Sequence, residues 1–295
     1  MTAANKKRVA VLGVTGMLGF AVARVLHADG HAITGMCRSE PKPEMQRLLD
    51  FPISTRIDFA DIAGVDVALG KCASDIVINC AANTSGADVG DPDALFVINT
   101  LFPRQLELIT ARTGTFLVHF STDSIFDGAT PPHSETSVPV PLDRYALSKY
   151  LGETTGANAL TIRTSMIGRS LASRQTFADW ALTTTEPIIE GYSNAIFTGL
   201  PVTIIAEFLR DHVVGVDLPP SGILHLAAEP IDKYRLLKLI LSAWRREDLV
   251  VRENNSPRPD RSLASTRIES IMDTPFPNWP EMITSMRRFY SDFGL

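Results

Sequence analysis

The stretch RVAVLGVTGMLG, residues 8–19, decides the fold. It begins with an apolar run rich in β-branched residues, Arg8 to Leu12, which predicts a buried strand. The run leads into Gly13, Gly16 and Gly19, glycines at intervals of three. Glycine permits a tight turn and lets backbone N–H groups approach a pyrophosphate, while the helix that follows adds a favourable partial charge. Because the glycines stand between a strand and a helix near the N-terminus, they predict a dinucleotide-binding turn.

Further apolar runs recur along the chain with helix-like segments between them. They are His31 to Met36, Asp75 to Ala81, Thr115 to Phe120 and Ala159 to Arg163. Strands that alternate with helices are typical of βαβ units on a parallel sheet. Asp91 followed by Pro92 forms an N-cap with proline in the first turn, and it predicts an amphipathic helix that reaches about Arg112.

After Arg163 the pattern loosens, until Gly222 to Ala227 predicts one more buried strand and Lys233 to Trp244 predicts a helix. We therefore predict an α/β fold, a Rossmann-type doubly wound parallel sheet with a smaller, discontinuous C-terminal substrate lobe. The expected boundaries are 1–164 and 196–228 for the NAD(P)-binding Rossmann domain, and 165–195 and 229–295 for the substrate-binding lobe.

The composition excludes several classes of protein. With 295 residues, 45% of them hydrophobic, the chain can bury an ordinary core. Its net charge is −5 and its basic residues are scattered singly, so we expect no nucleic acid partner. The three cysteines lack metal-ligand or paired spacing, which predicts no disulfide framework and no metal site. No apolar stretch approaches the roughly 18 residues that cross a bilayer, so we expect no membrane association and a cytoplasmic protein.

The end of the second run indicates which dinucleotide binds. A site selective for NAD places an acid there to hold the ribose 2′-hydroxyl, but this sequence has Arg38 and Ser39. A guanidinium can bind a 2′-phosphate, so these residues favour NADPH, with NADH or an ordinary surface arginine as alternatives. Asp58 is placed to meet the adenine edge. The predicted cofactor-binding residues are Gly13, Thr15, Gly16, Met17, Leu18, Gly19, Arg38, Ser39, Asp58, Ala81, Ala82, Asn83, Tyr145 and Lys149.

The segment DRYALSK, residues 143–149, carries the predicted chemistry. It places Tyr145 and Lys149 four residues apart, hence on one face of a helix. A nearby ammonium favours the phenolate and lowers the pKa of a tyrosine toward the working range of an acid–base catalyst. Thr122 follows the strand that ends at Phe120, and ligands of open α/β sheets bind beyond the carboxyl ends of strands. We therefore expect the Thr122 hydroxyl to share a cleft with the pair and to hold the substrate oxygen.

These segments together resemble an extended short-chain dehydrogenase/reductase, specifically the dTDP-4-dehydrorhamnose reductase family. The matching pieces span nearly the whole chain: Gly13 to Gly19, Val77 to Ala82, Val97 to Asn99, Ser121 to Gly128, Tyr145 to Lys149 with Gly152-Glu153, Arg163 to Ser165, Gly222 to Ala227, and Arg258-Pro259 with Ser262-Leu263. The resemblance implies Thr122, Tyr145 and Lys149 as catalytic residues. It also implies NADPH-dependent reduction of the C4 ketone of a nucleotide-linked 4-keto-6-deoxy sugar, made for surface polysaccharide.

Two departures from the family pattern leave the sugar open. The sequence after Ala81 to Thr84 is shorter than the family's acidic stretch, and Ser124 replaces the aromatic residue expected after Asp123. Both positions face substrate in this family, so a UDP-linked 2-acetamido-4-keto-6-deoxy sugar is an alternative to the dTDP-linked ketosugar. The predicted substrate-binding residues are Thr84, Asp123, Ser124 and Arg258, with the segment Asn194 to Val202.

Other functions stay compatible with the same motifs. A nucleotide-sugar epimerase or dehydratase with retained NAD would use the same catalytic residues, and Asp123 supplies the acid that dehydratases of this superfamily add. Arg38 argues against this function, because relatives that retain their cofactor generally prefer NAD. A non-catalytic NADP-binding regulatory subunit is a further alternative. The sequence also leaves a homodimer open.

Overall fold

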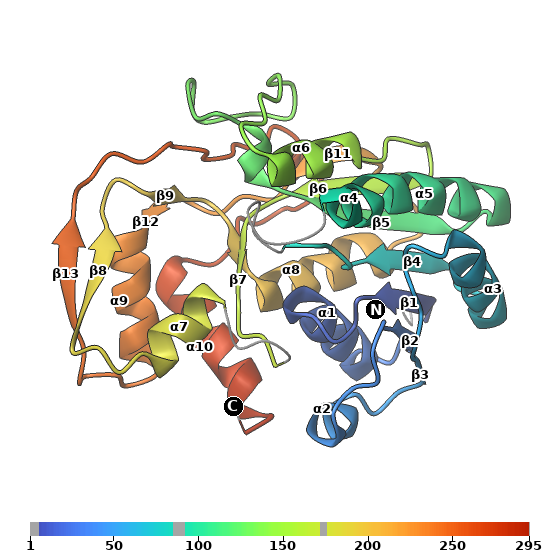
Figure 1. The fold of residues 1–295 in the computed structure, drawn as a ribbon, viewed down its shortest axis with the longest axis horizontal. Helices are drawn as coiled ribbons and strands as arrows, with labels where there is room; N and C mark the ends of the chain where they lie inside the picture. The colour runs from blue at the N-terminus through green and yellow to red at the C-terminus, as the bar shows by residue number, and fades with distance from the viewer. Residues whose placement is uncertain (1–5, 85–91, 172–175, 295) are drawn as a thin grey trace.

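The computed structural model describes residues 6–84, 92–171 and 176–294. Its centre is a seven-stranded sheet of order β11-β6-β5-β4-β1-β2-β3, in which every neighbouring pair is parallel (Figure 1). The strands are β1 (Arg8–Leu12), β2 (Ala32–Met36), β3 (Ile53–Ser54), β4 (Ile76–Asn79), β5 (Phe116–Ser121), β6 (Ala159–Arg163) and β11 (Gly222–His225). The order runs outward from β1 in both directions, which confirms the predicted Rossmann-type doubly wound sheet.

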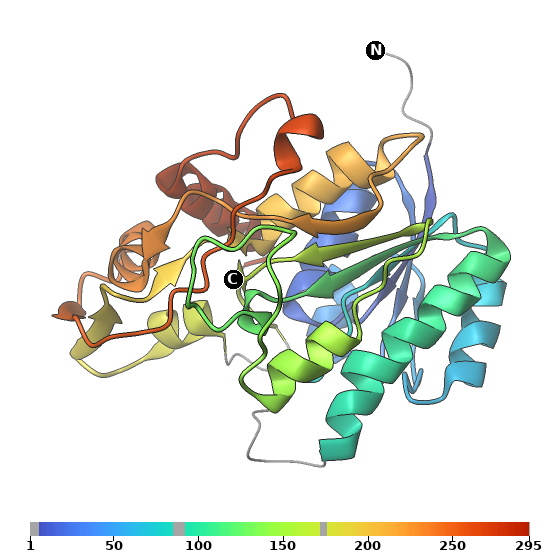
Figure 2. The ribbon, with the colours of Figure 1, turned by 90° about the horizontal axis from the view of Figure 1, so that it is seen from above.

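The sheet separates two hydrophobic cores, because successive side chains of a strand point to opposite faces. Val9 and Val11 of β1 belong to one core, and Ala10 and Leu12 belong to the other. The helices beside the sheet are α1 (Met17–Ala28) and α8 (Val202–Leu209) in the first core, and α3 (Ile62–Cys72) and α5 (Phe102–Thr113) in the second. Figure 2 shows the sheet between these two helical layers.

The helix expected to reach Arg112 is confirmed over its described part. It consists of α4 (Pro92–Phe96), a π-helical turn (Val97–Leu101) and α5 in direct succession. Gly114 ends it in the left-handed region, with a φ of 69°. Asp91, the expected N-cap, lies outside the described residues.

Beyond β6 the chain leaves the sheet and forms a group of small elements on the left of Figure 1. This group pairs β7 (Met166–Ile167) with β10 (Leu200–Pro201), β8 (Ile188–Tyr192) with β13 (Val250–Asn254), and β9 (Ile196–Phe197) with β12 (Ile231–Asp232). Beyond β6 the chain also forms the helices α7 (Phe177–Thr183), α9 (Lys233–Ala243) and α10 (Trp279–Ser291), whereas α2 (Pro43–Leu48) and α6 (Arg144–Leu151) precede β6. The chain returns to the sheet at β11 before it forms β12, so the group is discontinuous in sequence. The domain boundaries given above stay a prediction.

No helix within the described ranges is long and apolar enough to span a bilayer. The same part of the chain contains no cluster of three His, Cys, Asp or Glu side chains arranged to hold a metal ion. The three cysteines are free thiols, of which Cys37 is buried.

Candidate active site

The turn between β1 and α1 leaves no room for a side chain at Gly13 or Gly19. Gly13 has a φ of 74°, and a Cβ atom there would lie 2.9 Å from the backbone nitrogen of Ala81. A Cβ atom on Gly19 would overlap the carbonyl group of Gly13. Gly16 caps α1 without a side-chain hydrogen bond, which leaves N–H groups of the first helical turn for an anion. This backbone cradle fits the diphosphate of a dinucleotide. The other residues expected in it are Thr15, Met17 and Leu18, which lie in the same turn.

The residues expected at the adenosine end follow neighbouring strands. Arg38 and Ser39 are exposed just beyond the end of β2, and Asp58 lies beyond β3. A backbone hydrogen bond of 3.1 Å from Ile57 to Cys37 joins the two segments. The structure therefore brings these predicted residues to the same edge of the sheet as the glycine cradle.

The segment after β4, Ala81 to Asn83, is tied to helix α6 by Asn99. Asn99 is completely buried in the π-helical turn. Its side chain accepts a hydrogen bond from the N–H of Asn83 (2.8 Å) and donates to the carbonyl of Asn83 (2.9 Å) and the hydroxyl of Ser148 (3.0 Å). Asn99 therefore sets the spacing between this segment and Lys149, the next residue of α6. Sequence reasoning gave Asn99 no role, because its motif does not reveal a π-helical turn.

Thr122 and Tyr145 meet beyond the carboxyl end of β5. The hydroxyl of Thr122 accepts a hydrogen bond from the N–H of Ser124 (3.1 Å), which caps the turn after the strand. Asp143 caps α6 with its side chain, at 2.7 Å from a backbone N–H, and so fixes the turn that carries Tyr145. The hydroxyl of Thr122 lies close enough to the phenol of Tyr145 to lower its pKa. The structure therefore places the two hydroxyl groups near each other.

Lys149 lies one helical turn beyond Tyr145 and is buried. Its ammonium group donates a hydrogen bond of 2.6 Å to the carbonyl of Phe120, at the end of β5. Burial lowers the pKa of Lys149 to about 8, although the carboxylate of Glu153 opposes this shift. Glu153 is itself paired with Arg163 through two bonds of 2.8 Å, and both side chains are buried. The ammonium is therefore costly to bury and is held in place by polar groups of the sheet and the helix.

The pKa of Tyr145 corrects the sequence-based expectation. We expected an ammonium to lower this pKa, but burial raises the pKa of Tyr145 to about 12. The carboxylate of Asp123 adds to the increase, and the nearby hydroxyl of Thr122 only partly opposes it. The ammonium of Lys149 is bound to the carbonyl of Phe120 and does not offset the burial. The expectation was therefore wrong, and the phenol keeps its proton at neutral pH.

A cleft of about 540 Å³ opens next to this site and extends to the elements beyond β6. Asp123, Ser124 and Arg258, which the sequence predicted to bind substrate, all line it, as do Ala195 to Phe197 from the predicted segment. Thr84 is exposed and does not line this cleft. The structure therefore brings Asp123, Ser124, Arg258 and residues 195–197 together, whereas Thr84, Asn194 and residues 198–202 do not line the cleft.

Basic side chains line part of the cleft. Lys233 and Arg261 line it together with Arg258. The guanidinium of Arg258 lies over the ring of Tyr192, 4.3 Å from its centroid. Sequence reasoning missed Lys233 and Arg261, because Lys233 begins α9 and Arg261 lies in an irregular segment, and only the tertiary fold brings both to the cleft. Such a set of basic side chains suits a ligand with a diphosphate group.

Comparison with known families agrees with this arrangement. Residues 7–290 match the family model described as RmlD substrate binding domain. The chain belongs to this family. Membership confirms the resemblance drawn from the glycine turn, the strand ends and the Tyr145–Lys149 pair.

Among the relatives of this RmlD family chain, some are named as reductases and others as a subunit of another enzyme. The probable low-salt glycan biosynthesis reductase Agl14 of Haloferax volcanii is 26% identical over 305 aligned residues, which cover 96% of this chain and 98% of that protein. The methionine adenosyltransferase 2 subunit beta of Pongo abelii is 34% identical over 150 residues, which cover 50% of this chain and 42% of that protein. The match to a reductase thus extends over the full chain, and the match to the subunit extends over half of it.

Solved structures share the fold. The dTDP-4-dehydrorhamnose reductase of Bacillus anthracis, determined in complex with NADP, has a TM-score of 0.76 at 21% identity, covering 98% of this chain and all of that one. The Bordetella bronchiseptica enzyme WbmG, in complex with NAD and UDP, has a TM-score of 0.78 at 18% identity, covering 98% and 96%. At this level of identity the likeness establishes the fold.

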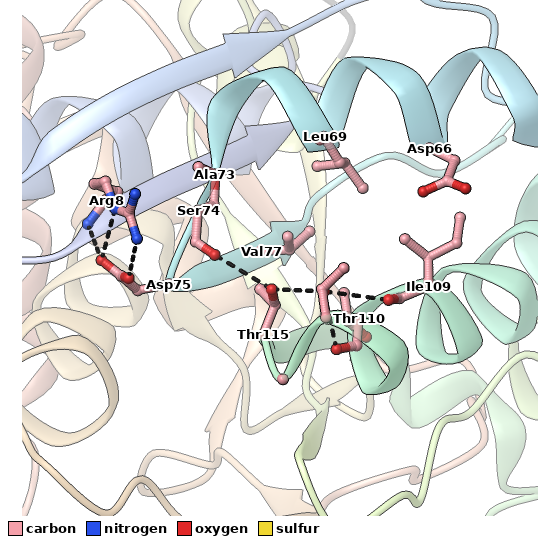
Figure 3. Close-up of a pocket in the computed structure, with 13 residues that line it drawn as sticks. Arg8, Asp66, Leu69, Ala73, Ser74, Asp75, Val77, Ile109, Thr110 and Thr115 are labelled. Atoms are coloured by element: carbon pink, nitrogen blue, oxygen red, sulfur yellow. Dashed lines mark hydrogen bonds and ion pairs between the residues drawn. The ribbon is translucent and has the colours of Figure 1, made fainter.

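A second hollow of about 320 Å³ lies between α3 and α5, at the opposite edge of the sheet (Figure 3). Its charged groups pair with their neighbours: Nη2 of Arg8 lies 2.7 Å from Oδ1 of Asp75. The hydroxyl of Thr115 donates to the carbonyl of Ser74 at 3.2 Å. None of the predicted site residues lines this hollow. The cleft at the carboxyl ends of the strands is therefore the candidate active site of this RmlD family member.

Proposed function

We propose that the protein is a dTDP-4-dehydrorhamnose reductase-like enzyme of surface polysaccharide sugar biosynthesis. It would reduce the C4 ketone of a nucleotide-linked 4-keto-6-deoxy sugar with NADPH. The observation that carries this proposal is the position of Tyr145. Its protonated phenol lies near Thr122 and Asp123, and Asp123 lines the cleft that also carries basic side chains. The reductase names of full-length relatives support the same activity.

Tyr145 acts as the proton donor in this proposal. When bound in the cradle, NADPH would supply the hydride that C4 receives. The ketone oxygen takes the proton of Tyr145 and becomes an alcohol, and the phenolate regains a proton from solvent in the cleft. Thr122 would hold the same oxygen through its hydroxyl group, and Lys149 would hold the nicotinamide ribose. Positioned proton transfer of this kind contributes roughly 10² to 10⁴ in rate.

The cleft supports a nucleotide-linked substrate. Lys233, Arg258 and Arg261 would hold the diphosphate, and Asp123 and Ser124 would contact the sugar beside Tyr145. The small side chain of Ser124 leaves space there, which keeps a UDP-linked 2-acetamido-4-keto-6-deoxy sugar as the alternative substrate. Arg38 and Ser39 would select NADPH by binding the 2′-phosphate, with NADH as the alternative cofactor.

A substrate panel tests the proposal. The purified protein is mixed with NADPH and with dTDP- or UDP-linked 4-keto-6-deoxy sugars, and the loss of NADPH absorbance is followed, with NADH in parallel. We expect oxidation of NADPH with at least one sugar. A preference for NADH would overturn the role of Arg38. No oxidation with any sugar would favour a non-catalytic regulatory subunit; a relative that matches half of the chain is named as a subunit of methionine adenosyltransferase 2.

An epimerase or dehydratase with retained NAD is favoured by one observation. Asp123 accepts a hydrogen bond from Thr122 (3.2 Å), and its carboxylate raises the pKa of Tyr145. It therefore lies where a dehydratase would need a second acid. Such an enzyme keeps its cofactor through purification, so release of the bound nucleotide by acid and its identification as NAD would support it. The homodimer and the cytoplasmic location stay predictions; sedimentation equilibrium of the purified protein tests the first.

A further inference from the structure

Arg169 follows β7 at a point where the chain touches the glycine cradle. A Cβ atom on Gly168 would lie 3.2 Å from Cγ of Met17, the first residue of α1. The backbone before Arg169 therefore packs directly on the start of the helix whose N–H groups face the cofactor diphosphate. The turn of residues 13–19 carries no charged side chain, although a diphosphate brings two negative charges.

The peptide group of Arg169 is fixed by the C-terminal helix. The hydroxyl of Tyr290, on α10, accepts a hydrogen bond from the N–H of Arg169 (2.8 Å) and donates one to its carbonyl (3.1 Å). Tyr290 is completely buried. A single side chain thus satisfies both polar groups of one residue beside the cradle, which prevents that segment from shifting.

The guanidinium of Arg169 is held from one side. Its Nε atom lies 3.2 Å from Asp179 of α7, a carboxylate that is 1% exposed, while the arginine side chain keeps 17% exposure. Asp179 also accepts hydrogen bonds from the N–H of Ser170 (2.8 Å) and the hydroxyl of Thr176 (2.9 Å). Within residues 6–84, 92–171 and 176–294, the two terminal nitrogens of Arg169 have no hydrogen-bond partner. Terminal nitrogens in this state are those that bind phosphate oxygens.

We propose that Arg169 binds the diphosphate of the dinucleotide and so supplies the positive charge that the glycine cradle lacks. The inference rests on the proposed function only in requiring a dinucleotide cofactor. It assigns a cofactor contact to the elements beyond β6, through an arginine oriented by Asp179 and Tyr290. Cofactor binding would accordingly stabilise α7 and α10 as well as the sheet.

Ligand binding tests this proposal without a sugar substrate. Arg169→Gln is compared with Arg246→Gln, whose native arginine pairs with an aspartate, binds the end of α7 and does not contact the cradle. The probes are NADPH, ADP-ribose and adenosine 2′-monophosphate, each titrated by calorimetry. ADP-ribose carries the diphosphate, and the monophosphate does not.

We expect Arg169→Gln to weaken binding of NADPH and ADP-ribose by about 10- to 100-fold, the range typical for loss of a charge-assisted hydrogen bond. The monophosphate should bind as it does to the unmodified protein, and Arg246→Gln should bind all three ligands normally. Unchanged affinity of Arg169→Gln for ADP-ribose would overturn the proposal. Equal weakening of all three ligands would overturn it as well, because the loss would then not concern the diphosphate.

A double variant separates ligand binding from folding. Arg169→Gln leaves the buried carboxylate of Asp179 without its cation, which destabilises the protein. Combining it with Asp179→Asn removes both charges, and we expect the double variant to fold and still bind ADP-ribose weakly. Recovery of normal affinity would show that Arg169 serves only to neutralise Asp179. If the unmodified protein binds neither NADPH nor ADP-ribose, the proposed function fails, and this inference fails with it.

Discussion

Replacing Lys149 with methionine should make the protein more stable at neutral pH. The lysine is buried, and burial lowers its pKa from 10.5 to about 8. Each pKa unit is worth roughly 1.4 kcal/mol, so keeping this ammonium charged costs about 3 kcal/mol of folding free energy. The lost hydrogen bond to Phe120 offsets about 1 kcal/mol of the gain. We therefore expect Lys149→Met to raise the free energy of unfolding by about 2 kcal/mol at pH 7.

The pH dependence gives this prediction its sign. The pKa of Lys149 is lower in the folded state, so the unfolded chain binds more protons between pH 8 and 10.5. The cost of burial is therefore fully present below pH 8 and fades as the pH rises toward 10.5. The advantage of Lys149→Met should shrink over the same range.

Urea denaturation between pH 6.5 and 10 measures the difference. Lys71→Met, which removes an exposed lysine on α3, is the matched control and should show no such trend. The reasoning is refuted if Lys149→Met is less stable than the unmodified protein at pH 7, or if the difference between the two does not change with pH.

Other predictions concern the cradle and its support. Gly19→Ala should abolish tight binding of NADPH, since its Cβ would overlap the Gly13 carbonyl. In the control Gly70→Ala on α3, the added Cβ meets open space, and NADPH affinity should stay normal. Equal NADPH affinities of the two variants would contradict the role of the cradle. Asn99→Ala should lower the free energy of unfolding by about 2 to 4 kcal/mol in urea denaturation, because it removes buried hydrogen bonds to Asn83 and Ser148; a loss below about 0.5 kcal/mol would show that these bonds do not hold the site. Arg38→Ala should weaken NADPH about 10-fold in a fluorescence titration and leave NADH unchanged; equal effects on both would remove its proposed role.

Local sequence patterns predicted six of the seven strands of the sheet, all except the two-residue β3. The run Arg8 to Leu12 matches β1 residue for residue, and the glycines after it form the predicted turn. Tyr145 and Lys149 lie on one face of α6 because their spacing is a property of the helix alone. These features depend on residues close together in the chain, where periodicity and turn chemistry are decisive.

Features that depend on distant residues could not be predicted. Burial and the carboxylate of Asp123 reverse the expected direction of the pKa of Tyr145, and both arise from packing. Lys233 and Arg261 reach the cleft only through the arrangement of the elements beyond β6. Thr84 was placed near substrate by a family pattern, and the structure leaves it outside the cleft.

The proton donor is the centre of the account, and single-turnover kinetics tests it most directly. Excess enzyme with bound NADPH is mixed with a dTDP-linked 4-keto-6-deoxy sugar, and the absorbance of NADPH is followed for Tyr145→Phe and for Tyr150→Phe on the same helix. We predict that Tyr145→Phe slows the decay by roughly 10² to 10⁴ while its NADPH affinity is unchanged, and that Tyr150→Phe reacts at the normal rate. Reduction at the normal rate by Tyr145→Phe would contradict the account.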